Sequence, residues 1–400
     1  MKILAIETSC DETSVAVVED GKRVLSLVVN SQIDLHKAFG GVVPEVAARS
    51  HIEVMLPVVQ QALEEALAPS TTNHKLPNAN DYWNQIDAIA VTQGPGLLGS
   101  LLIGVLTART LAWSLNKPLY PIHHILGHVY ANWITAGPSY TTPYPVEQPE
   151  FPILALIVSG GHTQLMYATN HKDWRVIGRT TDDAVGEAFD KAAKVLGLPY
   201  PGGISLSKLA QNGDAGVYHL PTPKVSSIDP GLVDLRSQSS GLRENIGDST
   251  SLSKNQDLRT EASYNFSFSG LKTALLRAVQ KECGKSHNFP SFELSALLSE
   301  PQRANFAASF EATAINYLVS RTKAAFEEFQ PKTVIIGGGV AASIPLRKAL
   351  SAALPLEIKY APQILCTDNA AMIGARAYFQ SKNEDPVDPR HLETTPTWPL

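Results

Sequence analysis

A repeated order of elements limits the possible folds of this chain more than any other feature of its sequence. Three short apolar runs rich in β-branched residues, separated by turn-forming residues, predict an antiparallel meander, and a helical pattern follows them. The whole order occurs twice. The strand runs are residues 3–6, 14–18 and 24–29 in the first copy and residues 153–158, 164–167 and 174–177 in the second. Two copies of a meander followed by helix predict two related α/β halves.

The length of 400 residues also favours two halves, because a single hydrophobic core rarely organises so long a chain. Hydrophobic residues make up 44% and charged residues 18%, which is typical of globular proteins. Five prolines between residues 138 and 152 predict a connector between the halves. Residues 224–262, rich in Ser, Asp, Asn and Gly, predict a disordered insertion, and later prolines predict a flexible tail over residues 386–400.

We expect no membrane span. The apolar stretch at residues 97–115 is interrupted by small and polar residues and by Arg109, so it predicts a buried, closely packed helix. The first six residues are too short for a signal peptide and predict a strand. Three widely spaced cysteines, Cys10, Cys283 and Cys366, fit a reducing compartment, which predicts a cytoplasmic protein without disulfides.

His124 and His128 are four residues apart in a stretch that can form a helix. This spacing places both imidazoles on one helical face, one turn apart, where they can bind a single cation. Zinc proteases with an HExxH motif have a glutamate after the first histidine as general base, and this chain has Ile125 there. The pair can therefore hold a metal without being a protease site. Surface or capping histidines are the alternative, and a third ligand would decide between the two.

Glycine-rich turns follow two of the strand runs and suit an anion. At residues 159–161 we expect positive φ angles that point successive N–H groups at a phosphate, although a hairpin turn explains the same residues. Residues 337–339 are three glycines between a buried strand and a helix that starts near Ser343, which suits nucleotide contacts. For the glycines at residues 202–203, a ligand contact and a plain loop are equally plausible.

Several carboxylates could take part in such a site. Glu7, Asp11 and Glu12 crowd the turn between the first two strands and could orient a cation, although exposed turn acids are the commoner explanation. Asp190 lies on the polar face of a helical stretch, which a solvated surface explains without any function. Asp368 would by default cap the small-residue helix that comes after it. As a hard oxygen ligand it could also complete a site of two histidines and one carboxylate.

Seven motifs together resemble the tRNA N6-adenosine threonylcarbamoyltransferase family in its bacterial and organellar form. They are residues 6–13, 93–96, 123–128, 158–163, 186–191, 266–272 and 366–369. The resemblance covers about residues 1–218 and 264–378. It implies an α/β actin-like ATPase fold, made of two ribonuclease-H-like domains with the ligand in the cleft between them. We place the first domain at residues 1–125 with about 365–385, and the second at residues 126–364.

The resemblance also implies the residues of the site. The metal would be held by His124, His128 and Asp368, with Fe²⁺ expected and Zn²⁺ as the alternative, since imidazole with carboxylate suits both. The residues that would bind threonylcarbamoyl-AMP are Ile157, Val158, Ser159, Gly160, Gly161, Asp190 and Gly203. Family members usually have an asparagine at the position of Ser343, and some have an aspartate at that of Ser207, so the chain departs from the family pattern at both.

The activity that the resemblance implies is an acyl transfer to tRNA. The threonylcarbamoyl group would move from its mixed anhydride with AMP to N6 of the adenosine 3′ of the anticodon. An aromatic amine is a weak nucleophile, so the carbonyl needs activation, which a metal can supply. Asp11 or Glu12 could accept the proton of the amine. The acceptor base would have to leave the stacked anticodon loop to reach the site.

Net charge bears on how such a protein would meet its tRNA. The chain has 38 acidic and 33 basic residues, a net charge of −5, so no global positive field draws it onto a polyanion. We therefore expect partner subunits that help to capture tRNA. The resemblance implies a small paralogous subunit and an ATPase subunit.

Two other functions are compatible with parts of the pattern. An actin-like sugar or acid kinase would use the same glycine turns for ATP but has no need of the histidine pair. A non-catalytic nucleotide-binding scaffold, like degenerate paralogues of the family, has no need of the full set His124, His128 and Asp368. Absence of labelled threonine from tRNA, with ATP-dependent phosphorylation of a small molecule, would favour the kinase. Unchanged activity of the apo protein after exhaustive chelation would favour the scaffold.

Overall fold

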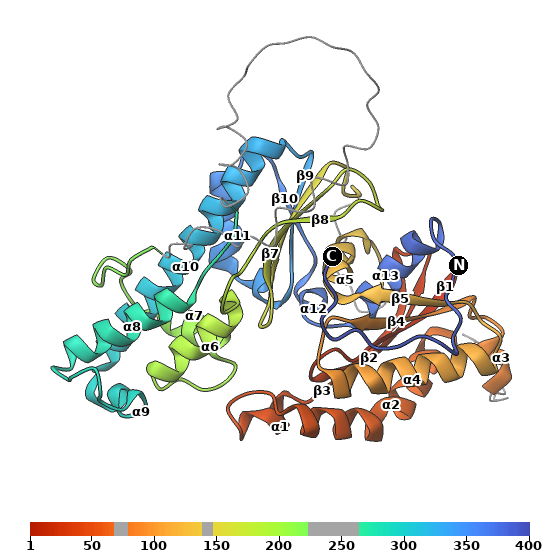
Figure 1. Cartoon of the computed structure of the whole chain (residues 1–400), viewed down its shortest axis with the longest axis horizontal. Coiled ribbons are helices and arrows are strands. Elements are labelled where there is room, and N and C mark those ends of the chain that lie inside the picture. Colours follow the sequence, from red (N-terminus) through yellow and green to blue (C-terminus); the bar gives the residue numbers. More distant parts are fainter. Residues whose placement is uncertain (68–78, 138–146, 223–263) are drawn as a thin grey trace, which may run out of the picture.

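The computed structural model of this protein describes residues 1–67, 79–137, 147–222 and 264–400. The insertion predicted at residues 224–262 and most of the proline-rich connector lie outside these described residues. The described chain forms two five-stranded mixed sheets, each flanked by helices (Figure 1). The two halves predicted from the repeated meander are therefore present, one sheet to each half.

The first sheet has the strand order β3-β2-β1-β4-β5. Its first three strands are antiparallel neighbours, while β4 lies parallel to β1 and β5 parallel to β4. The strands are β1 (Lys2–Glu7), β2 (Glu12–Glu19), β3 (Arg23–Ser31), β4 (Ala88–Gly94) and β5 (Leu119–His123). Because β1 and β4 are central strands covered on both faces, they consist almost entirely of buried residues rather than alternating ones.

The second sheet repeats this order and these directions. Its order is β10-β9-β6-β7-β8, with β6, β7 and β8 antiparallel and with β9 and β10 parallel to β6. The strands are β6 (Ile153–Val158), β7 (Thr163–Ala168), β8 (Arg175–Arg179), β9 (Thr333–Gly337) and β10 (Ile358–Tyr360). Two meanders, each extended by two parallel strands, form a pair of ribonuclease-H-like sheets. The predicted actin-like ATPase fold is confirmed.

Helices cover both faces of the first sheet. The outer face packs against α2 and α4, and the inner face packs against α13. The helices of this half are α1 (Ile33–Lys37), α2 (Pro44–Leu67), α3 (Ala79–Trp83), α4 (Leu98–Ser114), α5 (His124–Tyr130) and α13 (Ala370–Ser381). Small residues allow the close packing predicted for α4, since a Cβ at Gly104 would lie 2.4 Å from the Thr8 hydroxyl. One face of α4 is nevertheless exposed, contrary to the buried helix expected there.

The second half is organised around the long helix α10, which packs against α6, α7, α8 and α11. A capping box at Ser299 and Gln302 fixes where α10 begins. The helices are α6 (Val185–Val195), α7 (Gly202–Ala210), α8 (Ser269–Glu282), α9 (Ser291–Leu294), α10 (Glu300–Phe329), α11 (Ile344–Ala353) and α12 (Gln363–Cys366). Short 3-10 turns are η1 (Ala131–Trp133), η4 (Ser295–Leu297) and η5 (Gly339–Ala342).

Two helices connect the halves. Helix α5 continues directly from β5 of the first sheet and contacts β6 and β9 of the second. Helix α13 comes late in the chain yet packs against β1, β2 and β5, so the chain returns to the first half after completing the second. In Figure 1 both helices lie between the two sheets. Residues at the start of α5 and α13 are therefore brought together, although they are far apart in the sequence.

Residues 386–400 do not form the free tail that their prolines suggested. The Val387 N–H donates to Leu119 O, and Arg109 donates to the carbonyls of Pro389 and Arg390. Proline blocks helices and central strands, but its neighbours can still use their backbone groups to bind along an existing surface. The segment therefore runs along the first half.

Within the described residues, no helix combines the length and the apolar character that a bilayer span requires. All three cysteines are free, in agreement with the absence of disulfides expected from their spacing.

Candidate metal centre and active site

The predicted histidine helix exists as α5, and it begins at His124. The backbone enters it from β5 through His123, whose ring Nδ1 accepts the Ile125 N–H and caps the first turn. His124 and His128 are both buried, with ring centroids 4.8 Å apart and planes at 81°. As the spacing predicted, the two imidazoles leave the helix on one face.

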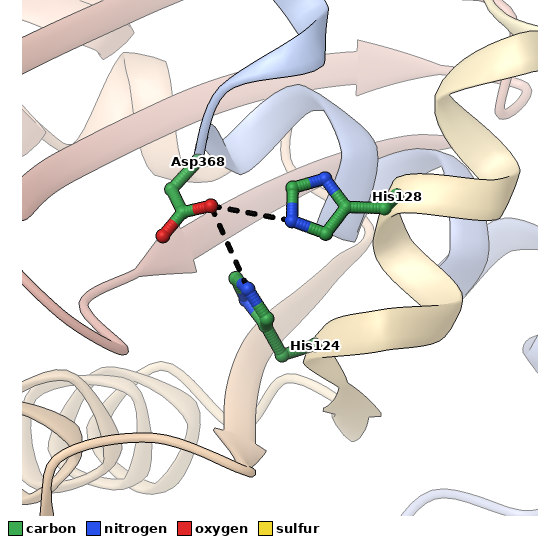
Figure 2. Close-up of side chains that lie close together, drawn as sticks. All are labelled: His124, His128 and Asp368. Carbon is green, nitrogen blue, oxygen red and sulfur yellow. Dashed lines mark ion pairs between the residues drawn. The ribbon is translucent and has the colours of Figure 1, made fainter. Parts of the chain in front are cut away.

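Asp368 meets this pair from the other end of the chain. Its Oδ1 lies 3.2 Å from His128 Nε2 and 3.6 Å from His124 Nε2, as Figure 2 shows. The expectation that Asp368 caps the following helix is wrong, because the Asn369 side chain accepts the Met372 N–H and is the N-cap of α13. Asn369 thereby leaves the Asp368 carboxylate free to face the histidines.

The three side chains fit a divalent cation. One donor atom from each of His124, His128 and Asp368 lies within 4.8 Å of the others, and no other such group of His, Cys, Asp or Glu is found among the described residues. Neither ring nitrogen of His128 makes a well-directed hydrogen bond, although both are buried and Nε2 lies 3.2 Å from Asp368 Oδ1. A buried imidazole nitrogen without a partner is costly unless something else binds it. Two imidazoles and a carboxylate are ligands that Fe²⁺ and Zn²⁺ both accept.

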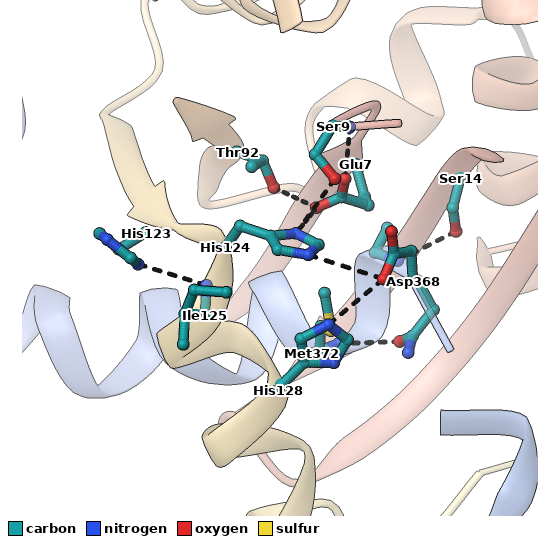
Figure 3. A network of polar contacts seen from close by, with 12 residues as sticks. Glu7, Ser9, Ser14, Thr92, His123, His124, Ile125, His128, Asp368 and Met372 are labelled. Carbon is teal, nitrogen blue, oxygen red and sulfur yellow. Dashed lines mark hydrogen bonds and ion pairs between the residues drawn. The ribbon is translucent and has the colours of Figure 1, made fainter. Parts of the chain in front are cut away.

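Glu7 orients the first histidine, and its role was missed at the sequence level. It is fully buried at the end of β1, where its Oε2 lies 3.1 Å from His124 Nδ1 and also accepts the Thr92 hydroxyl (Figure 3). Its Oε1 accepts the Ser9 N–H. A carboxylate on Nδ1 keeps the proton there and turns Nε2 toward the metal position. The sequence placed Glu7 among turn acids, and only its location at a strand end distinguished it.

Electrostatics tie these groups together. Burial alone would lower the pKa of His124, but the charges of Glu7 and Asp368 outweigh it and raise the pKa to about 9. Burial would conversely raise the pKa of Asp368, whereas His124 and His128 hold it well below its usual range. The pKa of Glu7 is also lowered, because His124 outweighs the effect of burial. Before any metal binds, His124 therefore carries a proton between two carboxylates.

The two predicted catalytic carboxylates lie in the turn between β1 and β2. Glu12 begins β2 and accepts a hydrogen bond from the Ser31 hydroxyl, while the Asp11 carbonyl accepts the Gln32 N–H. Burial, followed by the charges of Asp368 and Asp11, raises the pKa of Glu12 to about 9. In the metal-free protein Glu12 therefore holds a proton at neutral pH.

A family model described as tRNA N6-adenosine threonylcarbamoyltransferase (TsaD) matches residues 23–375 of this chain. The chain belongs to this family. Proteins of that name in Thermomicrobium roseum and Bacillus subtilis are 43% and 41% identical to it over 387 and 379 residues. The first alignment covers 95% of this chain and 92% of the Thermomicrobium protein. The second covers 94% of this chain and 89% of the Bacillus protein.

Among solved structures, component A of the (R)-2-hydroxyglutaryl-CoA dehydratase of Acidaminococcus fermentans is similar over 96% of this chain and all of that one. The identity is 13% and the TM-score 0.43. Nothing about the activity of this threonylcarbamoyltransferase family member follows from so distant a likeness.

The turn after β6 is where this family member was expected to bind its adenylate. Ile157 and Val158 have fully buried side chains, so only their backbone groups could meet a ligand. Ser159 and His162 close the turn, since Ser159 N donates to His162 O at 2.8 Å. The positive φ expected at Gly160 and Gly161 is not found, because a hairpin closed this way does not require it. Both positions are open, since a Cβ on either would meet nothing within 4 Å.

Asp190 and Gly203 lie together at the start of α7. The Asp190 carboxylate accepts the Gly202 N–H at 2.7 Å, so it does not join the solvated face of α6, where Glu187 pairs with Lys191. Burial raises the pKa of Asp190, against the effect of the Gly202 and Gly203 N–H groups. The Asp190 carboxylate thus lies at the N-terminus of α7, next to Gly203.

At both positions where the chain departs from the family pattern, the hydroxyl has a local partner. Ser207 donates to the buried carboxylate of Glu311 on α10. Ser343 is the N-cap of α11 and accepts the Leu346 N–H at 3.4 Å.

His162, which the sequence did not single out, is close enough to the candidate metal ligands to be affected by their charge. Burial, then the charges of His124 and His128, lower the pKa of His162 to about 4. The His162 imidazole, which belongs to the second half, is therefore neutral at neutral pH.

Proposed function

We propose that this chain transfers the threonylcarbamoyl group from threonylcarbamoyl-AMP to N6 of adenosine 37, 3′ of the anticodon, in tRNAs that read codons starting with A. The product is N6-threonylcarbamoyladenosine. The observation that carries the proposal is the convergence of His124, His128 and Asp368 in a chain of this family. A kinase or a scaffold of the same fold has no use for such a set.

We propose one divalent cation per chain, held by His124, His128 and Asp368, with Fe²⁺ the expected ion and Zn²⁺ the alternative. When bound, it would polarise the carbamoyl carbonyl as a Lewis acid. The chain's own contribution is orientation, because Glu7 fixes the tautomer of His124 and α5 fixes the spacing of both rings. Because both rings are buried, little water can compete with them for the cation.

The reaction forms one bond and breaks one. N6 of the adenosine attacks the carbamoyl carbon, and the bond from that carbon to the phosphate oxygen breaks, so that AMP leaves with the electron pair. The N6 proton must go to a base within hydrogen-bond reach. We propose Asp11 or Glu12, the two carboxylates that follow β1, as the acceptor.

The adenylate would lie against the second half. The open N–H groups of Gly160 and Gly161 suit its phosphate, and no hydrogen bond within the described chain occupies them. Asp190 and the start of α7 at Gly203 would position the remainder of the nucleotide. In this proposal the leaving group lies on the second half and the metal ligands lie on the first.

We propose a small paralogous subunit as partner on the face formed by α2 and α4, and an ATPase subunit as a further partner. The outward residues of these helices include exposed apolar side chains, namely Ile52, Leu56, Leu98, Leu102, Leu106 and Trp113. A helix that is apolar on both faces is expected to be covered on both. One side of α2 and α4 packs on the sheet, so the opposite, exposed side of these helices is available to a partner. We also propose that the protein works in the cytoplasm, where free thiols persist.

A transfer assay tests the function. The metal-loaded chain, with its partner subunits, is mixed with threonine-labelled threonylcarbamoyl-AMP and an unmodified tRNA transcript that carries adenosine at position 37. Label should enter this tRNA and not a matched transcript with guanosine at that position. No label in tRNA, together with ATP-dependent phosphorylation of a small molecule, would favour a kinase instead.

A further inference from the structure

Residues 393–398 bind across the ends of β4 and β5, at the edge of the first sheet that leads into α5. The Thr395 N–H donates to Gln93 O at 2.9 Å, and the Gln93 side chain donates back to Glu393 O at 2.9 Å. The Gly96 N–H donates to Pro396 O at 3.1 Å. Backbone hydrogen bonds in both directions fix this segment, which we call the 393–398 segment, and the chain end labelled C in Figure 1 lies beside α5.

Gly94 allows the segment to approach. A Cβ on Gly94 would lie 1.8 Å from Thr395 O, which is a backbone atom and cannot rotate away. Gly94 is also the register partner of His123, the last residue of β5. The segment therefore passes directly over the point from which α5 starts.

His123 joins the segment to the metal-ligand helix. Its Nε2 donates to Trp398 O at 2.9 Å, and its Nδ1 accepts the Ile125 N–H at 3.2 Å. The ring also lies 5.1 Å from the Trp398 indole. A neutral imidazole has one donor and one acceptor, and both are used here. The hydrogen bond to Trp398 therefore fixes the tautomer and orientation of the ring that caps α5.

A second route reaches the same site. The turn held by Gln93 and Gly96 is in contact with Ser9, since Leu97 N donates to Ser9 O at 2.8 Å. The Ser9 hydroxyl lies 3.2 Å from His124 Nδ1, beside Glu7. The segment thus supports His124 both through the cap of its helix and through the loop that contacts its ring.

We propose that the 393–398 segment is a positioning element for the metal centre, which holds His123 and the turn at residues 93–96 so that His124 and His128 keep their ligand geometry. The inference rests on the metal site of the proposed function and is independent of the identity of the acyl group. Partners of this kind around a metal ligand typically change metal affinity by about 10–100-fold.

The test compares two glycine variants of the full chain. Gly94→Ala should displace the 393–398 segment without touching a metal ligand. Gly178→Ala is the matched control, because its Cβ would lie 2.2 Å from another backbone oxygen, that of Tyr264 in the second half. We measure the affinity of each metal-free protein for Co²⁺ and the visible spectrum of the bound ion. Gly94→Ala should bind about tenfold more weakly with an altered spectrum, and Gly178→Ala should match the wild type.

A third variant keeps the proposal testable if either glycine variant fails to fold. His123→Asn retains an acceptor suited to capping α5 but is too short to reach Trp398. It should also weaken Co²⁺ binding by up to about tenfold, and the double variant with Gly94→Ala should lose less than the product of the two single losses, because both variants lose the hydrogen bond to Trp398. Wild-type affinity in His123→Asn and Gly94→Ala, equal weakening in Gly178→Ala, or losses that multiply in the double variant would overturn the proposal. A wild-type chain that binds no Co²⁺ would overturn the metal site itself, and the positioning role with it.

Discussion

The two halves of this molecule share one strand order and differ in the turn after their first strand. In the first half β1 ends at Glu7, a fully buried carboxylate with three hydrogen-bonding neighbours, and the turn continues to Glu12. In the second half β6 ends in a turn containing Gly160 and Gly161, where an added Cβ would meet nothing within 4 Å. One turn is charged and packed, and its counterpart is neutral and open.

This difference shows how one topology can supply two kinds of binding. Ligands of α/β sheets gather at the carboxyl ends of the parallel strands, and both first-strand turns lie at such ends. The first half contributes charged side chains, which suit a cation and proton transfer. The second half contributes backbone N–H groups and space, which suit a bulky anion. If the comparison holds, substitutions in the first half change metal binding, and substitutions in the second half change substrate binding alone.

The largest effect is expected from His128→Ala. Removing one of three ligands should abolish stable metal binding and lower the transfer rate by about 1,000-fold or more, as the loss of a group central to catalysis typically does. Metal content by mass spectrometry and the tRNA transfer assay measure both. His287→Ala, at an exposed histidine of the second half, is the control and should change neither. A His128→Ala chain that kept its metal would contradict the assignment of metal binding to the first half.

Glu7→Ala should have the next largest effect. Without the carboxylate, His124 loses the partner that fixes its tautomer, and metal affinity should fall about 10–100-fold. Glu7→Gln keeps one acceptor oxygen and should lose less. Competition with a chromophoric chelator gives both affinities. Unchanged affinity in Glu7→Ala would mean that the buried carboxylate serves only the stability of the first sheet.

The strand patterns and the order of the halves could be predicted because they rest on local periodicity. The pairing of His124 with His128 followed in the same way from helical spacing. Asp368 could not be found locally, since its contact with the histidines depends on α13 returning to the first sheet. The residues alone offered Asp368 only as a possible third ligand, and the family resemblance selected it. For Glu7 the only local signal was its position at the end of a strand, because a turn acid and a buried partner of an imidazole otherwise look alike in sequence.

Backbone contacts were the least predictable part. The prolines after residue 385 indicated a free tail, yet Trp398 and Thr395 bind the first half through carbonyl and N–H groups that every residue has. The same limit explains the error at Gly160, where glycine suggested a positive φ that the backbone does not adopt. Side-chain patterns report periodicity and chemistry, but they do not report where a backbone group finds its partner.

A smaller, graded effect is expected from pH. His124, with its pKa raised to about 9, holds a proton below that pH, and a cation must displace it. Metal affinity should therefore rise by up to about tenfold per pH unit between about pH 6.5 and 8.5 and level off above 9. Chelator competition at several pH values measures this slope. In Glu7→Ala the charge that raises the pKa is gone, so the rise should end at lower pH. A flat profile in the wild type would contradict the protonated state assigned to His124.

The smallest effect is expected from Gly160→Ala. The added methyl group enters open space, so the melting temperature and the metal affinity should stay at wild-type values, while KM for threonylcarbamoyl-AMP rises a few-fold. Gly338→Ala is the contrasting variant. Gly338 has a φ of +89° and a Cβ there would lie 2.4 Å from Val158 O, so this variant should lower the melting temperature. An altered metal affinity in Gly160→Ala would contradict the assignment of metal binding to the first half and substrate binding to the second.

Metal removal and reconstitution tests the central claim most directly. The chain is stripped with a strong chelator, and threonylcarbamoyl transfer to tRNA is measured before and after stepwise addition of Fe²⁺ or Zn²⁺. The proposed function predicts no transfer by the stripped chain, full recovery at one cation per chain, and no recovery in His128→Ala. Full transfer by a stripped chain without measurable metal would contradict it.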